Sequence, residues 1–71
     1  MNTINPKKLQ LSKWTALKPI NKEKHFLVIE LELDEEGGVE ECVIEAVMTK
    51  RAQAIDWREL KDDSRWLQGW L

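Results

Sequence analysis

Residues 25–49 read H-F-L-V-I-E-L-E-L-D-E-E-G-G-V-E-E-C-V-I-E-A-V-M-T, and this stretch decides the fold. Apolar residues stand two positions apart in both of its halves: Leu27, Ile29, Leu31 and Leu33 in the first, and Cys42, Ile44, Ala46 and Met48 in the second. A spacing of two is typical of a β-strand with one buried face. Gly37 and Gly38 lie between the halves and supply the positive φ angles that tight hairpin turns need. The stretch therefore predicts an antiparallel hairpin.

The length of the turn leaves two registers open. A two-residue turn pairs Leu33 with Cys42, whereas a four-residue turn pairs Leu31 with Cys42. Both registers keep the eight alternating apolar residues on one buried face, because only a slip by an odd number of residues turns side chains over. The opposite face is acidic toward the tip and apolar at the other end. We therefore expect another segment of the chain to cover its apolar end.

The segments on either side of the hairpin predict further strands. Residues 9–17 lie between Pro6 and Pro19 and alternate enough to form a third strand. We expect residues 18–22 to form the loop that leads into the hairpin. After the hairpin, Ala54-Ile55 is a candidate for a short fourth strand.

The C-terminal part of the chain carries helix signals. Asp56 is a suitable N-cap residue and Glu59 follows at the position of a capping box. Residues 64–68 predict a second short helical turn that Gly69 ends. The expected fold class is mainly β (α+β) in a single domain, residues 1–71. It consists of a small antiparallel sheet of three or four strands, with a curl toward an SH3-like half-barrel as one option, and a short C-terminal helix.

Length and composition exclude several classes of protein. The 71 residues are 42% hydrophobic and 34% charged, which is typical of one soluble domain with a small core. The longest apolar run, Phe26–Ile29, is far shorter than the roughly 20 residues of a membrane-spanning helix. The first residues lack the apolar stretch of a secretory signal, and a single cysteine cannot form an internal disulfide. We therefore expect a cytoplasmic protein with no membrane partner.

The charges are unevenly distributed along the chain. Residues 1–24 contain six lysines and one glutamate, whereas residues 25–49 contain eight acidic residues and no lysine or arginine. The remaining residues are nearly balanced, and the net charge is −2. This pattern excludes a uniform basic field for nucleic acid but leaves open a basic patch assembled from both ends of the chain.

The sequence offers few residues for catalysis. Only His25 and Cys42 are candidates for a nucleophile and its base, and the hairpin keeps them about 20–26 Å apart at roughly 3.3 Å per residue. We expect Cys42 to be a small buried hydrophobic residue. We predict no catalytic residue, no cofactor and no metal ligand, and we do not expect an enzyme.

Four tryptophans in 71 residues are the most unusual feature of the composition. Tryptophan is enriched where a surface buries a partner, and it also stacks on nucleic-acid bases. A small core needs large side chains as well, so we expect most of the four to be buried or to form a lid. Cations neighbour several of them. The candidate partner-binding residues are Lys13, Trp14, Lys50, Arg51, Arg58, Arg65, Trp66 and Trp70.

These residues support three hypotheses for function. The first is a non-catalytic module that binds a protein partner. The second is a module that binds nucleic acid through the basic residues and an exposed tryptophan. The third is a homodimeric structural domain whose tryptophan surface forms the subunit interface. Trp66 and Trp70 are four positions apart, a spacing that lets them share one side of a helical end.

Five segments suggest a family resemblance. They read SKWTA (12–16), KHFLV (24–28), CVIEAV (42–47), IDWREL (55–60) and SRWLQGW (64–70). In this order and at this chain length they resemble the Trp-rich conserved hypothetical proteins of bacteria. That family has no established activity, substrate or cofactor, so the resemblance implies no role for any residue.

Overall fold

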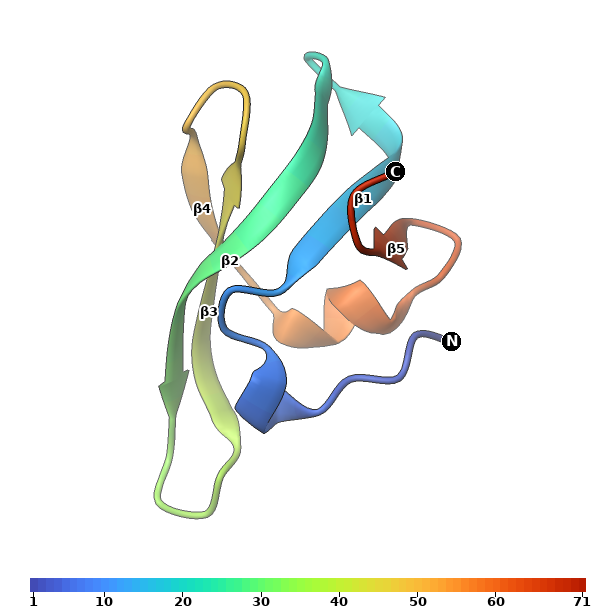
Figure 1. Ribbon diagram of the computed structural model, residues 1–71. Helices are drawn as coiled ribbons and strands as arrows, with labels where there is room; N and C mark the ends of the chain where they lie inside the picture. Colours follow the sequence, from blue (N-terminus) through green and yellow to red (C-terminus); the bar gives the residue numbers. More distant parts are fainter.

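All 71 residues are described by the computed structural model, in which five antiparallel strands form one sheet. The elements follow the order η1 (Pro6–Lys8), β1 (Lys13–Ile20), β2 (Glu23–Leu33), β3 (Val39–Ala46), β4 (Ala52–Ile55), η2 (Trp57–Lys61) and β5 (Trp66–Gln68). In the sheet the strand order is β4-β3-β2-β1-β5 (Figure 1). The prediction of a mainly β, antiparallel fold is confirmed, but there are five strands instead of three or four.

The long β2–β3 hairpin forms as predicted and projects beyond the rest of the sheet (Figure 1). Near its tip Leu31 pairs with Cys42, which is the register of the longer turn. Asp34 orders this turn, because its Oδ1 accepts hydrogen bonds from the backbone N–H groups of Glu36 and Gly38, both at 2.8 Å. Gly37 has φ +85°, so one of the two glycines supplies the left-handed conformation that the turn requires.

A β-bulge in β2 changes which side chains face the core. Val28 pairs with Ile44, but the next pair joins Glu30 to Val43, so Ile29 is the extra residue. Because of this one extra residue, the side chains that face the core before Ile29 and those that face it after Ile29 do not belong to the same alternating set. The prediction that Leu27 and Ile29 lie on the buried face is therefore wrong.

At that end of β2 the alternate residues, Phe26 and Val28, face the core instead. The eight buried hydrophobic residues of the core are Leu9, Trp14, Phe26, Val28, Cys42, Ile44, Ala46 and Leu60. Of the residues predicted on β3, Met48 lies beyond the strand and is 77% exposed, whereas the other three are buried. Leu33, near the hairpin tip, is also exposed.

No α-helix forms at the C-terminal end. Asp56 does cap the next element, since its Oδ1 accepts a 3.0 Å hydrogen bond from the N–H of Arg58, but that element is the five-residue 3-10 helix η2. Glu59 does not complete the predicted capping box; its carboxylate accepts a hydrogen bond from Arg65. A helix this short needs tertiary packing for its stability, which the fully buried Leu60 supplies. The structure contains no helix with the length and hydrophobicity needed to span a bilayer.

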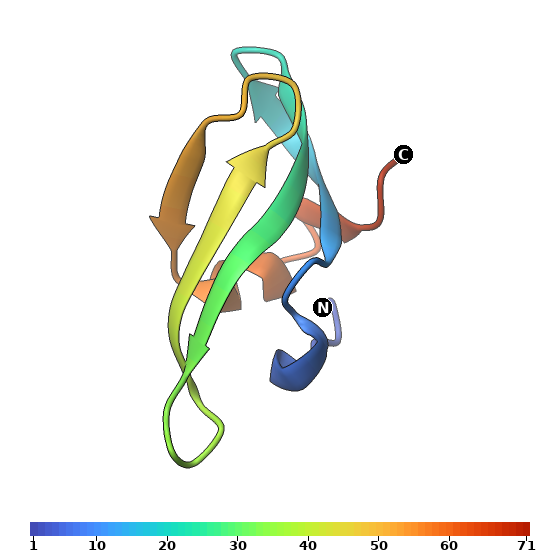
Figure 2. The same ribbon diagram turned by 60° about the vertical axis from the view of Figure 1, so that its left-hand side comes forward.

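Residues 64–68 form part of a strand instead of a helical turn. Trp66 pairs with Ala16, and β5 thereby extends the sheet beyond β1 (Figure 2). Strand pairing with distant residues outweighs the weak helical preference of a short segment. Trp66 and Trp70 consequently do not share one side of a helix.

β1 is shifted relative to its prediction. It begins at Lys13 because Leu11 adopts a left-handed φ of 65°, and it continues to Ile20 through Pro19. Pro19 is tolerated since the pairing between β1 and β2 is interrupted between Thr15 and Ile20. The loop that was predicted over residues 18–22 is reduced to the turn at Asn21 and Lys22.

Candidate functional site

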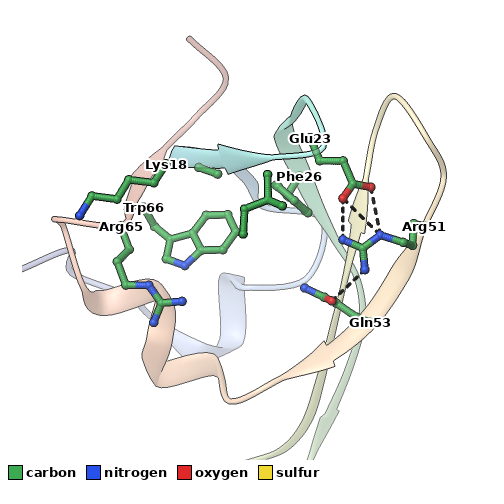
Figure 3. A pocket seen from close by; sticks show the side chains of 9 residues that line it. Lys18, Glu23, Phe26, Arg51, Gln53, Arg65 and Trp66 are labelled. Carbon is green, nitrogen blue, oxygen red and sulfur yellow. Dashed lines mark hydrogen bonds and ion pairs between the residues drawn. The ribbon is translucent and has the colours of Figure 1, made fainter.

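The inner side of the sheet is hollowed by a groove of about 300 Å³ (Figure 3). We call it the Trp66 groove. Its principal side chains are Lys18, Glu23, Phe26, Arg51, Arg65 and Trp66. They come from β1, β2, the approach to β4 and the start of β5, so distant parts of the chain assemble the site.

An aromatic pair forms the apolar part of the groove. Phe26 and Trp66 meet edge to face, with ring centroids 5.2 Å apart and an interplanar angle of 82°. This geometry is the favoured one for aromatic pairs because it brings the positive edge of one ring to the negative face of the other. Phe26 is buried, whereas Trp66 is partly exposed, so part of the indole remains available to a ligand.

A buried carboxylate holds Arg51 in place. Glu23 is only 3% exposed, and its two oxygens accept hydrogen bonds from Arg51 Nε at 3.2 and 3.1 Å and from Arg51 Nη2 at 2.5 Å. Thr49 Oγ1 also donates to Glu23. The bonds from Arg51, and then that from Thr49, lower the pKa of Glu23 below its usual value. Glu23 therefore stays ionised and orients the guanidinium at the groove wall.

Cations surround the aromatic pair. Lys18 and Arg65 lie on one side of it and Arg51 on the other (Figure 3). Lys18 has no hydrogen bond or ion pair within the chain, and Arg65 makes one exposed ion pair, to Glu59 at 3.4 Å. Glu23 compensates Arg51 and Glu59 compensates Arg65, so Lys18 is the cation of the lining that has no ion pair. The groove is therefore suited to a ligand group that joins a negative charge to an apolar part.

The structure brings three of the predicted binding residues together in the groove, namely Arg51, Arg65 and Trp66. Two others lie elsewhere. Lys50 occupies the turn before β4 with φ 62°, and Arg58 pairs with the neighbouring Asp56 at 3.2 Å. The basic residues therefore do not converge on one surface.

The remaining three predicted residues lie outside the groove. Trp14 is 1% exposed and donates from Nε1 to Ser12 Oγ at 2.8 Å, so it belongs to the core and offers no binding surface. Trp70 is 41% exposed, and Lys13 Nζ lies 4.8 Å from its ring centroid. The Trp70 indole N–H donates to the carbonyl of Phe26 at 2.9 Å. Lys13 and Trp70 thus form a separate pair on the outer face.

The tryptophan pattern resembles that of a known protein family, and comparison with family models supports this resemblance. The family described as "Tryptophan-rich protein (DUF2389)" matches residues 12–71. The chain belongs to this family. No curated protein and no solved structure matches the chain. The SH3-like curl therefore stays a prediction.

The match to the tryptophan-rich family includes all five strands and all four tryptophans, each of which has its own environment. Trp14 fills the core and Trp66 lines the groove. Trp70 lies over the outer side of the sheet, and Lys61 Nζ lies 4.6 Å from the ring centroid of Trp57. The expectation that most of them serve the core or a lid agrees with this arrangement, because Trp57 and Trp66 pack against the core that contains Trp14. Trp66 lines the groove, and Trp57 lines a second hollow of about 270 Å³ beside Cys42 and Ile55.

Three of the six principal groove residues are not among the residues predicted from the sequence: Lys18, Glu23 and Phe26. Lys18 was assigned to a loop, and Glu23 is one acid among thirteen in the chain. Regular alternation with Leu27 and Ile29 inside puts Phe26 on the outer face, whereas the bulge at Ile29 turns it toward the core. Only the position of Glu23 between Lys22 and Lys24, as the single acid in a basic segment, was a signal that this carboxylate is special.

Neither of the two residues considered for catalysis lines the groove. Cys42 is 1% exposed, and burial raises the pKa of its thiol to about 11, which agrees with the predicted role as a small hydrophobic residue. The His25 Nε2 atom lies 2.7 Å from the carbonyl oxygen of Leu71. This contact ties the C-terminal residues to the outer face of β2.

Proposed function

We propose that the chain is a protein-binding module and that the Trp66 groove takes an acidic segment of its partner. The observation that carries this proposal is the combination of an aromatic pair with the unpaired cation of Lys18 in one hollow. A volume of about 300 Å³ is at the lower limit for small-molecule sites, and it suits one or two peptide side chains. A peptide carboxylate near Lys18 and an apolar side chain against Trp66 match the two kinds of surface.

The arrangement of charges favours a protein partner over nucleic acid. Arg51, Arg58 and Arg65 each pair with a carboxylate of the chain, at Glu23, Asp56 and Glu59 respectively. Cations that are already compensated add little to the counterion release that drives nucleic-acid binding. Binding to nucleic acid stays the second hypothesis, and a homodimer stays the third.

A charge reversal at Lys18 tests the proposal. The probe is the capped heptapeptide acetyl-Thr-Val-Glu-Val-Glu-Val-Thr-amide, and the readout is the Trp66 indole resonance in an NMR titration. Exposed ion pairs contribute about 0.2–1 kcal/mol, and reversal replaces attraction by repulsion, so we expect Lys18→Glu to weaken binding about fivefold. Lys24→Glu makes the same change of charge at an exposed lysine outside the groove, and it should leave the affinity nearly unchanged.

Two further observations separate the outcomes. A peptide with lysine in place of both glutamates should not shift the Trp66 resonance. Equal binding of the acidic and basic peptides, or equal weakening by Lys18→Glu and Lys24→Glu, contradicts recognition in the groove.

A further inference from the structure

The two edges of the sheet differ in how they are covered. At the β5 edge, Asn2 Nδ2 donates to the carbonyl of Trp66 and Gln68 Nε2 donates to the carbonyl of Thr3, both at 2.8 Å. The N-terminal segment thus covers that edge. β4 forms the opposite edge, and Figure 2 shows no segment on its outer side. Three of its four residues are exposed.

The register of β4 shows which backbone groups point outward. Ala46 N–H donates to the carbonyl of Arg51 at 2.9 Å, so Arg51 faces β3. In an antiparallel pair the residues that exchange hydrogen bonds alternate along the strand. Gln53 and Ile55 therefore also face β3, and Ala52 and Ala54 direct their N–H and C=O groups toward the open edge.

β4 lacks most of the features that protect natural sheet edges. Such edges usually carry lysine, proline, a bulge or an inward-pointing charge. The strand reads Ala-Gln-Ala-Ile and has a regular register with β3. Its protection is its length of four residues, which offers a partner strand only the outward groups of Ala52 and Ala54. A strand added here needs further contacts, and the neighbouring groove provides them.

The groove lies on the same side of β4 as the side chains of Arg51 and Gln53 (Figure 3). Alternate side chains of an added strand would point to that side. They would therefore point into the groove from the wall that holds Arg51 and its partner Glu23, toward the unpaired Lys18 on the other side (Figure 3). The intervening side chains would lie beside Ala52 and Ala54. Acidic residues at every second position match this arrangement.

We propose that the edge of β4 binds an extended acidic segment of another protein as a sixth strand, with its acidic side chains over the Trp66 groove. This inference rests on the proposed function and specifies how the partner is held. A second copy of the chain is a poorer occupant. In a second copy the only comparably open strand is β4 itself, which has no acidic residue to place over the groove.

Proline at position 54 tests the edge separately from the groove. Ala54→Pro removes an N–H that points outward, and proline is accepted on edge strands. Ala54→Val keeps that N–H and is the matched control. With the acidic heptapeptide as probe, we expect Ala54→Pro to weaken binding about tenfold and Ala54→Val to change it less than about twofold. Circular dichroism and urea unfolding show whether each variant keeps the fold.

A modified peptide makes the same test on the unchanged protein. N-methylation of the two glutamates removes the two central donors on one edge of the probe, and N-methylation of the three valines removes all three donors on its other edge. One of the two peptides should lose binding and the other should retain most of it, because a strand pairs through one edge only. Equal affinity of the two methylated peptides overturns the proposal.

The remaining outcomes distinguish this inference from the proposed function. If Ala54→Pro binds as the unchanged protein does while Lys18→Glu weakens binding, the groove stands and the edge proposal is wrong. No binding at peptide concentrations up to about 2 mM contradicts both. Sedimentation that shows a dimer, and a monomer for Ala54→Pro, assigns the edge to a second copy and overturns the proposal.

Discussion

Two neighbouring alanine substitutions in β2 measure the effect of the bulge on the core. Val28 has no exposed surface, whereas Ile29, the extra residue of the bulge, is only partly buried. A regular alternating strand continued from the Leu31–Cys42 pair would reverse this order and bury Ile29 opposite Ile44. The pair Val28→Ala and Ile29→Ala therefore discriminates between the bulged strand and the regular one.

The expected magnitudes follow from the burial of the two side chains. Val28→Ala removes two buried carbons, at about 0.8 kcal/mol each, and leaves a cavity that adds about 1 kcal/mol. The sum is about 2.5 kcal/mol. Ile29→Ala removes three carbons that are only partly buried, and solvent fills the space, so we expect about 1 kcal/mol. The loss of β-propensity is similar in both variants and largely cancels in the comparison.

Urea unfolding followed by tryptophan fluorescence provides the assay. A chain of this length is stable by about 4–10 kcal/mol, so both variants should remain folded in buffer. With an m-value of about 1 kcal/mol/M, the midpoint for Val28→Ala should lie about 1.5 M below that for Ile29→Ala. A cost for Ile29→Ala equal to or greater than that for Val28→Ala would refute the bulged register and restore the regular alternation.

Two further predictions concern ionisable groups. Because Cys42 is buried and its thiol has a pKa of about 11, Ellman's reagent should label it slowly at pH 8 and rapidly in urea; rapid labelling of the folded protein would show that the thiol is accessible. Glu23 has a lowered pKa, chiefly because Arg51 donates hydrogen bonds to it, so its contribution to stability is complete above the usual pKa of 4.5 and is lost as the pH falls through the lower folded value. Urea midpoints between pH 7 and pH 3 should therefore depend less on pH in Glu23→Gln than in the exposed control Glu35→Gln, and identical profiles would show that the ion pair does not stabilise the fold.

The predictions that the structure confirms most closely are those that depend on neighbouring residues in the sequence. Alternation over residues 39–46 placed Cys42, Ile44 and Ala46 on the buried face, and all three are buried. The Gly37-Gly38 turn located the hairpin tip, and Asp56 was identified correctly as a cap. Each of these features depends on the conformational preference of one or two residues, or on a period of two, which is visible without any partner.

The errors have non-local causes. The bulge at Ile29 is set by how β2 fits against both β1 and β3, and alternation alone runs through it without a break. The segment around Trp66 carried helix signals, yet it pairs with β1, fifty residues earlier in the chain. Weak local preferences are decided by tertiary contacts, because a short helix gains little from its own hydrogen bonds.

The candidate site shows the same division. The residue types were available from the sequence, since Arg51, Arg65 and Trp66 were all named as candidates. The sequence does not show that these three residues converge, and it does not show that Lys18 from β1 and Phe26 from β2 join them. Glu23 acquires its role only because the turn before β4 brings Arg51 and Thr49 to it.

The sequence by itself determined the hairpin, the antiparallel class and the separation of acidic and basic segments, because these depend on periodicity, turn residues and charge. Tertiary structure decided which face of β2 is buried, which side chains surround Trp66 and which sheet edge stays open. The physical reason is that these properties belong to pairs of distant segments. Their free energy arises only when β1, β2, β4 and β5 meet, and no local stretch of the chain contains it.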